Sequence, residues 1–162
     1  MPQKAFDRVH HEMLFNKIYH DGIQGNLWLL LRNMYREVTV KVKWNNSLSE
    51  QFTQDIGVRQ GVKLSSVLYK RYNNSILKAL ERSDLGTTVG NIRVVAPTCA
   101  DDIAILGRNE YKNRALLDIV YNLTNMDLVT INPSKSDLVP STKSHTQIDI
   151  SLGENRILAV IM

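Results

Sequence analysis

Two neighbouring carboxylates, Asp101 and Asp102, stand between two apolar runs in residues 94–106, VVAPTCADDIAIL. Short runs rich in β-branched residues on both sides of a tight polar centre predict the two strands of a hairpin, with the acids at its turn. Burying two adjacent carboxylates without a partner is costly, so something should neutralise them. Two interpretations fit these residues: a solvated turn, since turns favour Asp, or a divalent-metal site with hard oxygen ligands, as in two-metal phosphoryl-transfer enzymes.

The length and charge of the chain narrow that choice only slightly. Its 162 residues allow one domain with a real core. The 20 Lys and Arg exceed the 16 Asp and Glu by 4, which is compatible with nucleic acid without requiring it. The single cysteine, Cys99, fits a reducing compartment. Because the sequence shows no signal-peptide hydrophobic region and its apolar runs are too short to span a bilayer, we expect an intracellular protein, in the cytoplasm or nucleus, with no membrane partner.

Apolar residues spaced by three and four predict four helices. They cover about residues 11–21, 23–36, 65–82 and 110–125. Their expected inward faces are Leu14 and Ile18; Leu27, Leu30, Leu31 and Met34; Leu68, Tyr72, Ile76 and Leu80; and Leu116, Leu117, Val120 and Leu123. Ser65 or Ser66 can cap the third helix, which follows the loop GVRQG at 57–61. A helix N-terminus that faces a glycine loop favours an anion, although any junction of a loop and a helix can look like this one.

Strict alternation of apolar and polar residues in VTVKVKW, residues 38–44, predicts a strand. Its expected inward side chains are Val38, Val40, Val42 and Trp44, and its outward ones are Thr39, Lys41 and Lys43. After a turn at Asn45 and Asn46, residues 48–53 return as the partner strand. The lysine-bearing face either touches phosphates or is an ordinary solvated face. Further strands are expected at residues 87–89, 91–95, 148–152 and 157–161.

Four segments together resemble the reverse transcriptase domain of non-LTR (LINE-type) retrotransposons. In chain order they are KAFDRVHHEML at 4–14, GVRQGVKLSSVLY at 57–69, CADDIAIL at 99–106 and INPSKS at 131–136. The resemblance covers nearly the whole chain, and the four motifs in sequence are specific where each alone is not. It implies an α+β fold, an antiparallel palm sheet with helices packed on one face, as in right-hand polymerases. It also implies a single palm domain over residues 1–162, truncated at both ends, with fingers and thumb largely missing.

The implied activity is RNA-templated DNA synthesis, in which a DNA primer is extended from deoxynucleoside triphosphates (dNTPs) with two Mg²⁺ ions. In such reactions two divalent ions about 3.5–4 Å apart clamp the attacking and leaving oxygens, and carboxylates suit such hard ions. The resemblance implies that Asp101 is a principal metal ligand and Asp102 a second. It implies that Lys135 donates a proton to the departing pyrophosphate or stabilises it; a surface lysine is the competing interpretation.

The resemblance also implies a nucleotide pocket. Phe6 would pack under the sugar of the incoming nucleotide and hinder a ribose 2′-hydroxyl, or be a core residue, and both can hold. Gln60 and Gly61 would line the pocket, because glycine allows a close backbone approach. Arg59 would reach phosphate or the template backbone. The paired acids are then expected to share this pocket with Phe6 and Gln60.

One departure from the family pattern bears on activity. The family's first metal-binding aspartate lies five residues before the phenylalanine of the KAFD segment, and counting back from Phe6 reaches Met1. Asp7 is the other acid of that segment and is not the metal ligand in the family, so it receives no catalytic role. Because loss of one ligand leaves the ion pair poorly held, we expect little or no polymerase activity from this chain alone.

Two other functions fit the same sequence. The chain would be a non-catalytic relic palm if it binds nucleic acid or a protein through its basic residues rather than its acids. Those basic residues are Lys41, Lys43, Lys70, Arg71 and Arg82. Alternatively, the chain would be a relative such as an intron-encoded maturase, with a role in RNA splicing. A downstream maturase region would distinguish that function.

Overall fold

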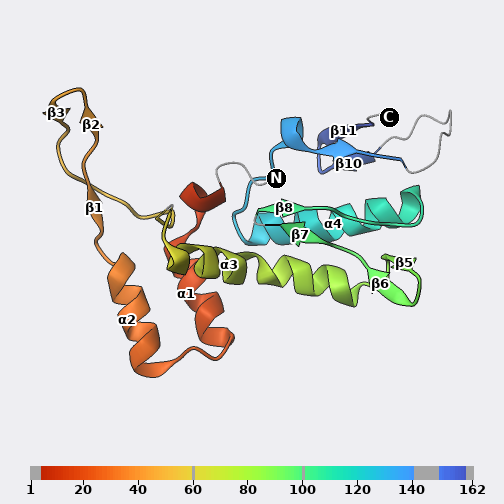
Figure 1. The fold of residues 1–162 in the computed structure, drawn as a ribbon, viewed down its shortest axis with the longest axis horizontal. Coiled ribbons are helices and arrows are strands. Elements are labelled where there is room, and N and C mark those ends of the chain that lie inside the picture. Colours follow the sequence, from red (N-terminus) through yellow and green to blue (C-terminus); the bar gives the residue numbers. More distant parts are fainter. Residues whose placement is uncertain (1–4, 60, 100, 141–149, 160–162) are drawn as a thin grey trace. The chain divides into compact units, whose positions relative to one another are not determined.

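The computed structural model describes residues 5–59, 61–99, 101–140 and 150–159 (Figure 1). Helices alternate with short strands along the chain, so the mixed α and β class expected from the sequence is confirmed. The described residues fall into two compact units: the first is residues 6–72, and the second comprises residue 5 and the described residues from Asn73 onward. The boundary between the units lies within the longest helix, α3 (Lys63–Arg82).

The first unit opens with helices whose aromatic side chains pack together. A short 3-10 helix, η1 (Ala5–Arg8), precedes α1 (His11–His20) and α2 (Gly25–Tyr35). Leu14 and Ile18 of α1 are buried, as their spacing of four predicts. From α2, the Trp28 indole N–H donates to the carbonyl oxygen of Phe15 at 2.8 Å. The Tyr35 ring lies 5.7 Å from the Phe15 ring, between centroids. These aromatic contacts fix the face that α2 turns toward α1.

That face of α2 differs from the one that aliphatic spacing predicts. Of the expected stripe only Leu31 is buried, at 8% exposure. The other three residues, Leu27, Leu30 and Met34, are each more than half exposed, so their inward assignment is wrong. The face toward α1 combines Leu31 with the two aromatic residues just described, three positions before it and four after it. Aromatic side chains bury more area than leucine, and here they decide which side of the helix is covered.

A two-stranded ribbon follows α2 and carries a bulge. Its strands are β1 (Thr39–Val40), β2 (Lys43–Trp44), β3 (Ser47–Leu48) and β4 (Phe52–Thr53). β1 pairs antiparallel with β4 and β2 with β3, so the predicted strand and its return are confirmed. Between these pairs, residues 41–42 face residues 49–51, which marks one inserted residue. The inward assignments of Val42 and Trp44 are wrong because both are more than half exposed. Every residue from 41 to 50 is exposed, so neither face of the ribbon is covered at this end.

The long helix α3 has the apolar stripe that its sequence predicts. Leu68, Tyr72, Ile76 and Leu80 are all buried, the first two within the first unit and the last two within the second. Neither α3 nor any other helix among the described residues is long and apolar enough to cross a membrane.

The start of α3 does not follow the serine-cap prediction. The helix begins at Lys63, so Ser65 and Ser66 lie inside its first turns and neither is the N-cap. Ser65 is 1% exposed, and its hydroxyl has no hydrogen-bond partner among the described residues. Two serines in succession are compatible with a cap, but they do not locate the first helical residue.

The second unit packs strands and helices around an apolar core. Its elements are β5 (Thr87–Val89), β6 (Ile92–Val94), β7 (Thr98–Cys99), β8 (Asp102–Ile103), α4 (Glu110–Met126), η2 (Pro133–Lys135), β9 (Asp137–Leu138), β10 (Ile150–Leu152) and β11 (Asn155–Ala159). β5–β6, β7–β8 and β10–β11 are antiparallel pairs, and β9 joins β11 in parallel. The buried core consists of Ile76, Leu80, Val95, Leu116, Val120, Ile150, Leu152 and Ile157. The strands expected at 87–89 and 91–95 are confirmed. The last strand begins at Asn155, two residues before its predicted start, while residues 148–149 and 160–161 lie outside the described part of the chain.

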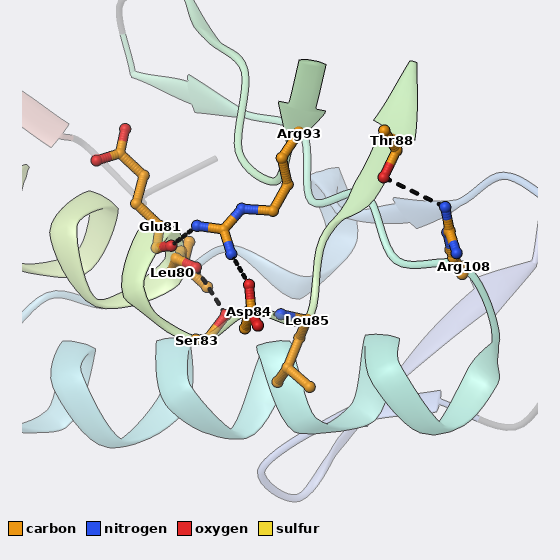
Figure 2. Close-up of polar contacts among 8 residues, drawn as sticks. All are labelled: Leu80, Glu81, Ser83, Asp84, Leu85, Thr88, Arg93 and Arg108. Atoms are coloured by element: carbon orange, nitrogen blue, oxygen red, sulfur yellow. Dashed lines mark hydrogen bonds and ion pairs between the residues drawn. The ribbon is translucent and has the colours of Figure 1, made fainter. Parts of the chain in front are cut away.

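An arginine fastens the β5–β6 hairpin to the end of α3 (Figure 2). Arg93 of β6 donates to the Asp84 carboxylate and to the backbone carbonyl oxygen of Glu81 in the last turn of the helix. A cation is favourable at that end, where helix carbonyls lack intrahelical partners. Arg108 also donates to the Thr88 hydroxyl at 3.2 Å. These contacts hold the strand that leads directly into the acidic segment.

The predicted stripe of α4 is confirmed, and its first turn is capped. Leu116 and Val120 are buried, and the other two residues of the stripe are half-buried. Asn109 is the N-cap, and its side-chain oxygen accepts the backbone N–H of Lys112 at 2.9 Å.

The C-terminal end of α4 contains an unusual backbone conformation. The Val129 N–H donates to the Thr124 carbonyl at 2.8 Å, and the Leu128 N–H donates to the Asn125 carbonyl at 3.4 Å. This is the Schellman arrangement, in which the residue after the cap is left-handed and most often glycine. Here that residue is Leu128, with φ 54°. A leucine in this conformation costs about 1–2 kcal/mol, so α4 ends at a locally strained position.

We predict that Leu128→Gly stabilises the chain by about 0.5–1 kcal/mol, because relief of the left-handed strain exceeds the entropy cost of glycine. Leu128 is half exposed, so little buried area is lost. The control is Met126→Gly, which places glycine at the exposed last residue of α4 and should destabilise by about 1 kcal/mol. Urea unfolding would measure both; equal losses of stability would contradict the prediction.

Candidate active site

The two acids lie at the tip of a tight hairpin, as the sequence predicts. β7 pairs antiparallel with β8 in the register Thr98↔Ile103 and Cys99↔Asp102. Asp101 therefore stands in the short connection, and Asp102 is the first residue of β8. One turn thus carries both carboxylates at successive positions.

The hairpin has shorter strands than predicted because Pro97 interrupts its ladder. Proline lacks the N–H that a continuous strand would donate. Its own carbonyl still accepts the Ala104 N–H at 3.0 Å, and two residues before it the Val95 carbonyl accepts the Leu106 N–H at 2.8 Å. Val94, expected in this hairpin, belongs to β6 instead. The base of the acidic hairpin is therefore tied to Val95, a residue of the apolar core.

One oxygen of Asp102 is buried in an unfavourable environment. Its Oδ1 is shielded from solvent and has no hydrogen-bond partner among the described residues. The residues Asp101 and Asp102 as wholes are half-buried. A buried carboxylate oxygen without a donor is costly, and a bound cation would offset that cost. The donor type fits a hard divalent ion, whereas the described residues contain no group of three or more His, Cys, Asp or Glu that could hold a metal.

Lys135 ends a short helical turn that is organised by Asn132. The Asn132 side-chain oxygen accepts the Ser134 N–H at 3.1 Å and the Ser134 hydroxyl at 2.7 Å. The Lys135 N–H donates to the Asn132 carbonyl at 3.2 Å, and the lysine side chain is exposed. Its assignment to the departing pyrophosphate stays a prediction.

In the first unit, backbone hydrogen bonds join the opening segment to the glycine loop. The Val58 N–H donates to the Phe6 carbonyl at 2.7 Å, and the Gly57 N–H donates to the Val9 carbonyl at 2.8 Å. A ring nitrogen of His11 lies 2.7 Å from the Gly57 carbonyl oxygen. Two of the four family-like segments, far apart in sequence, thus lie side by side.

The Phe6 ring is held by stacking on Tyr69 of α3. The ring centroids are 4.8 Å apart and the planes are inclined by 24°. Tyr69 is buried and Phe6 is half-buried, so part of the Phe6 residue stays open to solvent. Arg59 and Gly61 are exposed, and Gln60 lies outside the described residues. The structure therefore brings Phe6 together with the loop before Arg59. The acids and Lys135 belong to the second unit, and the shared pocket stays a prediction.

Two residues that shape these segments are missing from the sequence prediction. Asn132 had a usable signal, since an asparagine before Pro-Ser is typical of a side-chain-stabilised turn. Tyr69 had none, because the partner of a stacked ring is chosen by tertiary packing and not by local spacing.

Comparison with known proteins places the chain in a family. Residues 2–148 match the family described as Reverse transcriptase (RNA-dependent DNA polymerase). Because the match includes most of the chain, the protein belongs to the reverse transcriptase family. The matched range contains the acidic hairpin, the glycine loop and the Lys135 turn.

Two relatives come from transposable elements. The chain is 26% identical over 132 residues to "Retrovirus-related Pol polyprotein from type-2 retrotransposable element R2DM" of Drosophila melanogaster, an alignment that covers 82% of this chain and 12% of that protein. It is 31% identical over 109 residues to "Transposon TX1 uncharacterized 149 kDa protein" of Xenopus laevis, covering 66% of this chain and 8% of that protein. The chain therefore matches only a small share of each relative's length. These matches confirm the resemblance to the reverse transcriptase domain of non-LTR retrotransposons.

We predict that Gly57→Ala destabilises the chain more than Gly22→Ala does. Both glycines have nearly the same backbone, with φ +92° and +93°, so both alanines pay about 1–2 kcal/mol for a left-handed conformation. A Cβ at Gly57 would also meet the Asp7 backbone oxygen at 3.0 Å, whereas nothing lies within 4 Å of one at Gly22. The difference in unfolding free energy should be at least about 1 kcal/mol. Indistinguishable urea unfolding curves would show that the loop is not packed against the opening segment.

Proposed function

We propose that this chain is the palm region of an RNA-directed DNA polymerase that acts on a DNA primer, an RNA template and dNTPs. The observation that carries the proposal is the buried, unpartnered oxygen of Asp102 beside Asp101, at a hairpin tip within the family-matched range. Nucleotidyl transfer needs carboxylates held in one place to bind divalent ions, and a tight turn fixes two in succession. In this proposal the antiparallel pairs β5–β6, β7–β8 and β10–β11 of the second unit belong to a palm sheet with helices on one face.

Asp101 and Asp102 would hold Mg²⁺ in this proposal. When bound, two such ions supply charge stabilisation at the attacking and leaving oxygens. Lys135 is an exposed cation on a turn fixed by Asn132, so it is suited to meet a phosphate group. Its proposed role is to donate a proton to the departing pyrophosphate or to stabilise its charge.

The nucleotide would lie against Phe6 and the glycine loop. Stacking on Tyr69 limits the motion of the Phe6 ring, and a fixed flat ring can support a deoxyribose while excluding a 2′-hydroxyl. Gln60 and Gly61 would line the pocket, and the exposed Arg59 would contact phosphate or the template backbone.

We further propose that this site is impaired. Met1 stands where the family pattern has its first metal-binding aspartate, five residues before Phe6. A thioether is a soft ligand that cannot replace a carboxylate on Mg²⁺. The two remaining acids would bind a divalent ion weakly and hold it imprecisely.

The metal assignment predicts a loss of Mn²⁺ affinity in Asp101→Asn and Asp102→Asn. Each change removes a charged ligand, so the dissociation constant should rise at least about tenfold, as read by electron paramagnetic resonance of free Mn²⁺. Asp118→Asn, at an exposed position of α4, is the matched control and should leave affinity unchanged. Equal affinities in all four chains would remove the metal site from the proposal.

The impairment predicts that the chain as it stands gives no more than trace primer extension on an RNA template with Mg²⁺. Placing aspartate at position 1, behind an added initiator methionine, should raise Mn²⁺ affinity at least about tenfold by supplying the missing ligand. Glutamine at the same position is the uncharged control. Robust Mg²⁺-dependent extension by the unaltered chain would contradict the impairment.

A further inference from the structure

The tip of the β1–β4 ribbon exposes a tryptophan. Every residue from 41 to 50 is exposed, and Trp44 is 77% exposed. The other tryptophan of the chain, Trp28, is half-buried and hydrogen-bonded to the Phe15 carbonyl. Figure 1 shows β2 and β3 at the far end of the ribbon, away from α1 and α2 of the same unit. Trp44 therefore adds little to the folding of its own unit.

Hydrogen bonds of Ser49 hold the bulge of the ribbon together. The Ser49 N–H donates to the Val42 carbonyl at 2.9 Å, and the Val42 N–H donates in turn to the Ser49 hydroxyl at 2.9 Å. The Ser49 hydroxyl donates to the Glu50 carbonyl at 2.8 Å. The Ser49 side chain thus provides a hydrogen-bond partner for a backbone N–H at the bulge, where the two strands have unequal numbers of residues. The tip beyond it is a two-stranded turn. Its aromatic ring is presented on an ordered support.

The tip carries more positive than negative charge. Its exposed residues 41–50 contain two lysines, Lys41 and Lys43, and one acidic residue, Glu50. Among the described residues neither lysine has an ion-pair partner. Lys43 and Trp44 are successive residues of β2, so their side chains leave opposite faces of the ribbon, and both residues are exposed. A single-stranded nucleic acid that crosses the edge of the ribbon can stack a base on the ring while its phosphates meet the lysines.

We propose that this tip is a binding site for single-stranded nucleic acid, with Trp44 stacking on a base and Lys41 and Lys43 contacting phosphates. The inference rests on the proposed function only in taking nucleic acid as the partner. It needs neither the paired acids nor a metal ion, so it is testable without them.

The test is binding of a fluorescein-labelled oligo(U) of twelve nucleotides to the full chain in EDTA, measured by anisotropy. Trp44→Ala should weaken binding about tenfold, since stacking of one base contributes about 1–3 kcal/mol. The control is Leu48→Ala, another exposed apolar residue, in the paired strand, which should change affinity less than twofold. Lys43→Gln should lower the slope of log affinity against log salt by about 0.7, the loss of one phosphate contact.

Tryptophan fluorescence gives a second, independent readout. Oligo(U) should quench emission in Trp28→Phe, where Trp44 is the sole reporter, and should leave emission unchanged in Trp44→Phe. Equal oligo(U) affinity in Trp44→Ala and Leu48→Ala would overturn the inference. Emission from Trp44 that shifts with chain concentration, and not with oligo(U), would assign the tip to a protein interface and overturn it as well.

The two proposals fail separately. A chain with Asp101→Asn and Asp102→Asn should keep its oligo(U) affinity in EDTA, because the tip does not involve the acids. Loss of Mn²⁺ binding with intact oligo(U) binding supports both proposals. Unchanged Mn²⁺ binding with a tenfold Trp44 effect removes only the metal site.

Discussion

The cost of a carboxylate oxygen without a hydrogen-bond donor is the constraint on which the second unit depends. Asp102 Oδ1 is in that position among the described residues, on a hairpin whose base is tied by Leu106 N–H to the carbonyl of Val95. Val95 is itself buried in the core with residues of α3, α4 and β10. The acids are thus carried by a turn that the core holds in place.

In the first unit, the corresponding constraint is the close packing of the glycine loop on the opening segment that contains Phe6. Gly57 has a left-handed φ, and a Cβ built there would lie 3.0 Å from the Asp7 backbone oxygen, so the loop leaves little room for a side chain against the opening segment. The Val58 and Gly57 N–H groups complete that approach by donating to Phe6 and Val9. Packing against the opening segment therefore explains why glycine occupies position 57. This explanation does not depend on a bound nucleotide.

The sequence predicts the buried face best where a long helix keeps one regular spacing of apolar residues. In α3 every residue of the predicted stripe is buried, because twenty helical residues leave one consistent face. It predicts poorly where two kinds of side chain compete or where a strand extends beyond the elements that could cover it. Leu30 is exposed because aromatic residues take the covered face of α2, and Trp44 is exposed because neither face of the ribbon is covered at residues 41–50. For the site, spacing located the hairpin tip at Asp101 and Asp102. Pairing partners such as Tyr69 depend on tertiary contacts that no local pattern contains.

A competing physical explanation exists for the lysines of the ribbon. Exposed strand edges are commonly protected by lysine, which discourages pairing with another chain, and Lys41 and Lys43 stand on such edges. That explanation accounts for the charges and not for Trp44. A large exposed apolar ring would not protect a strand edge against association. Leu48 and Phe52 on the return strand add to the exposed apolar surface. A single-stranded nucleic acid accounts for both features, because its bases can stack on the exposed ring and its phosphates can contact the unpaired lysines.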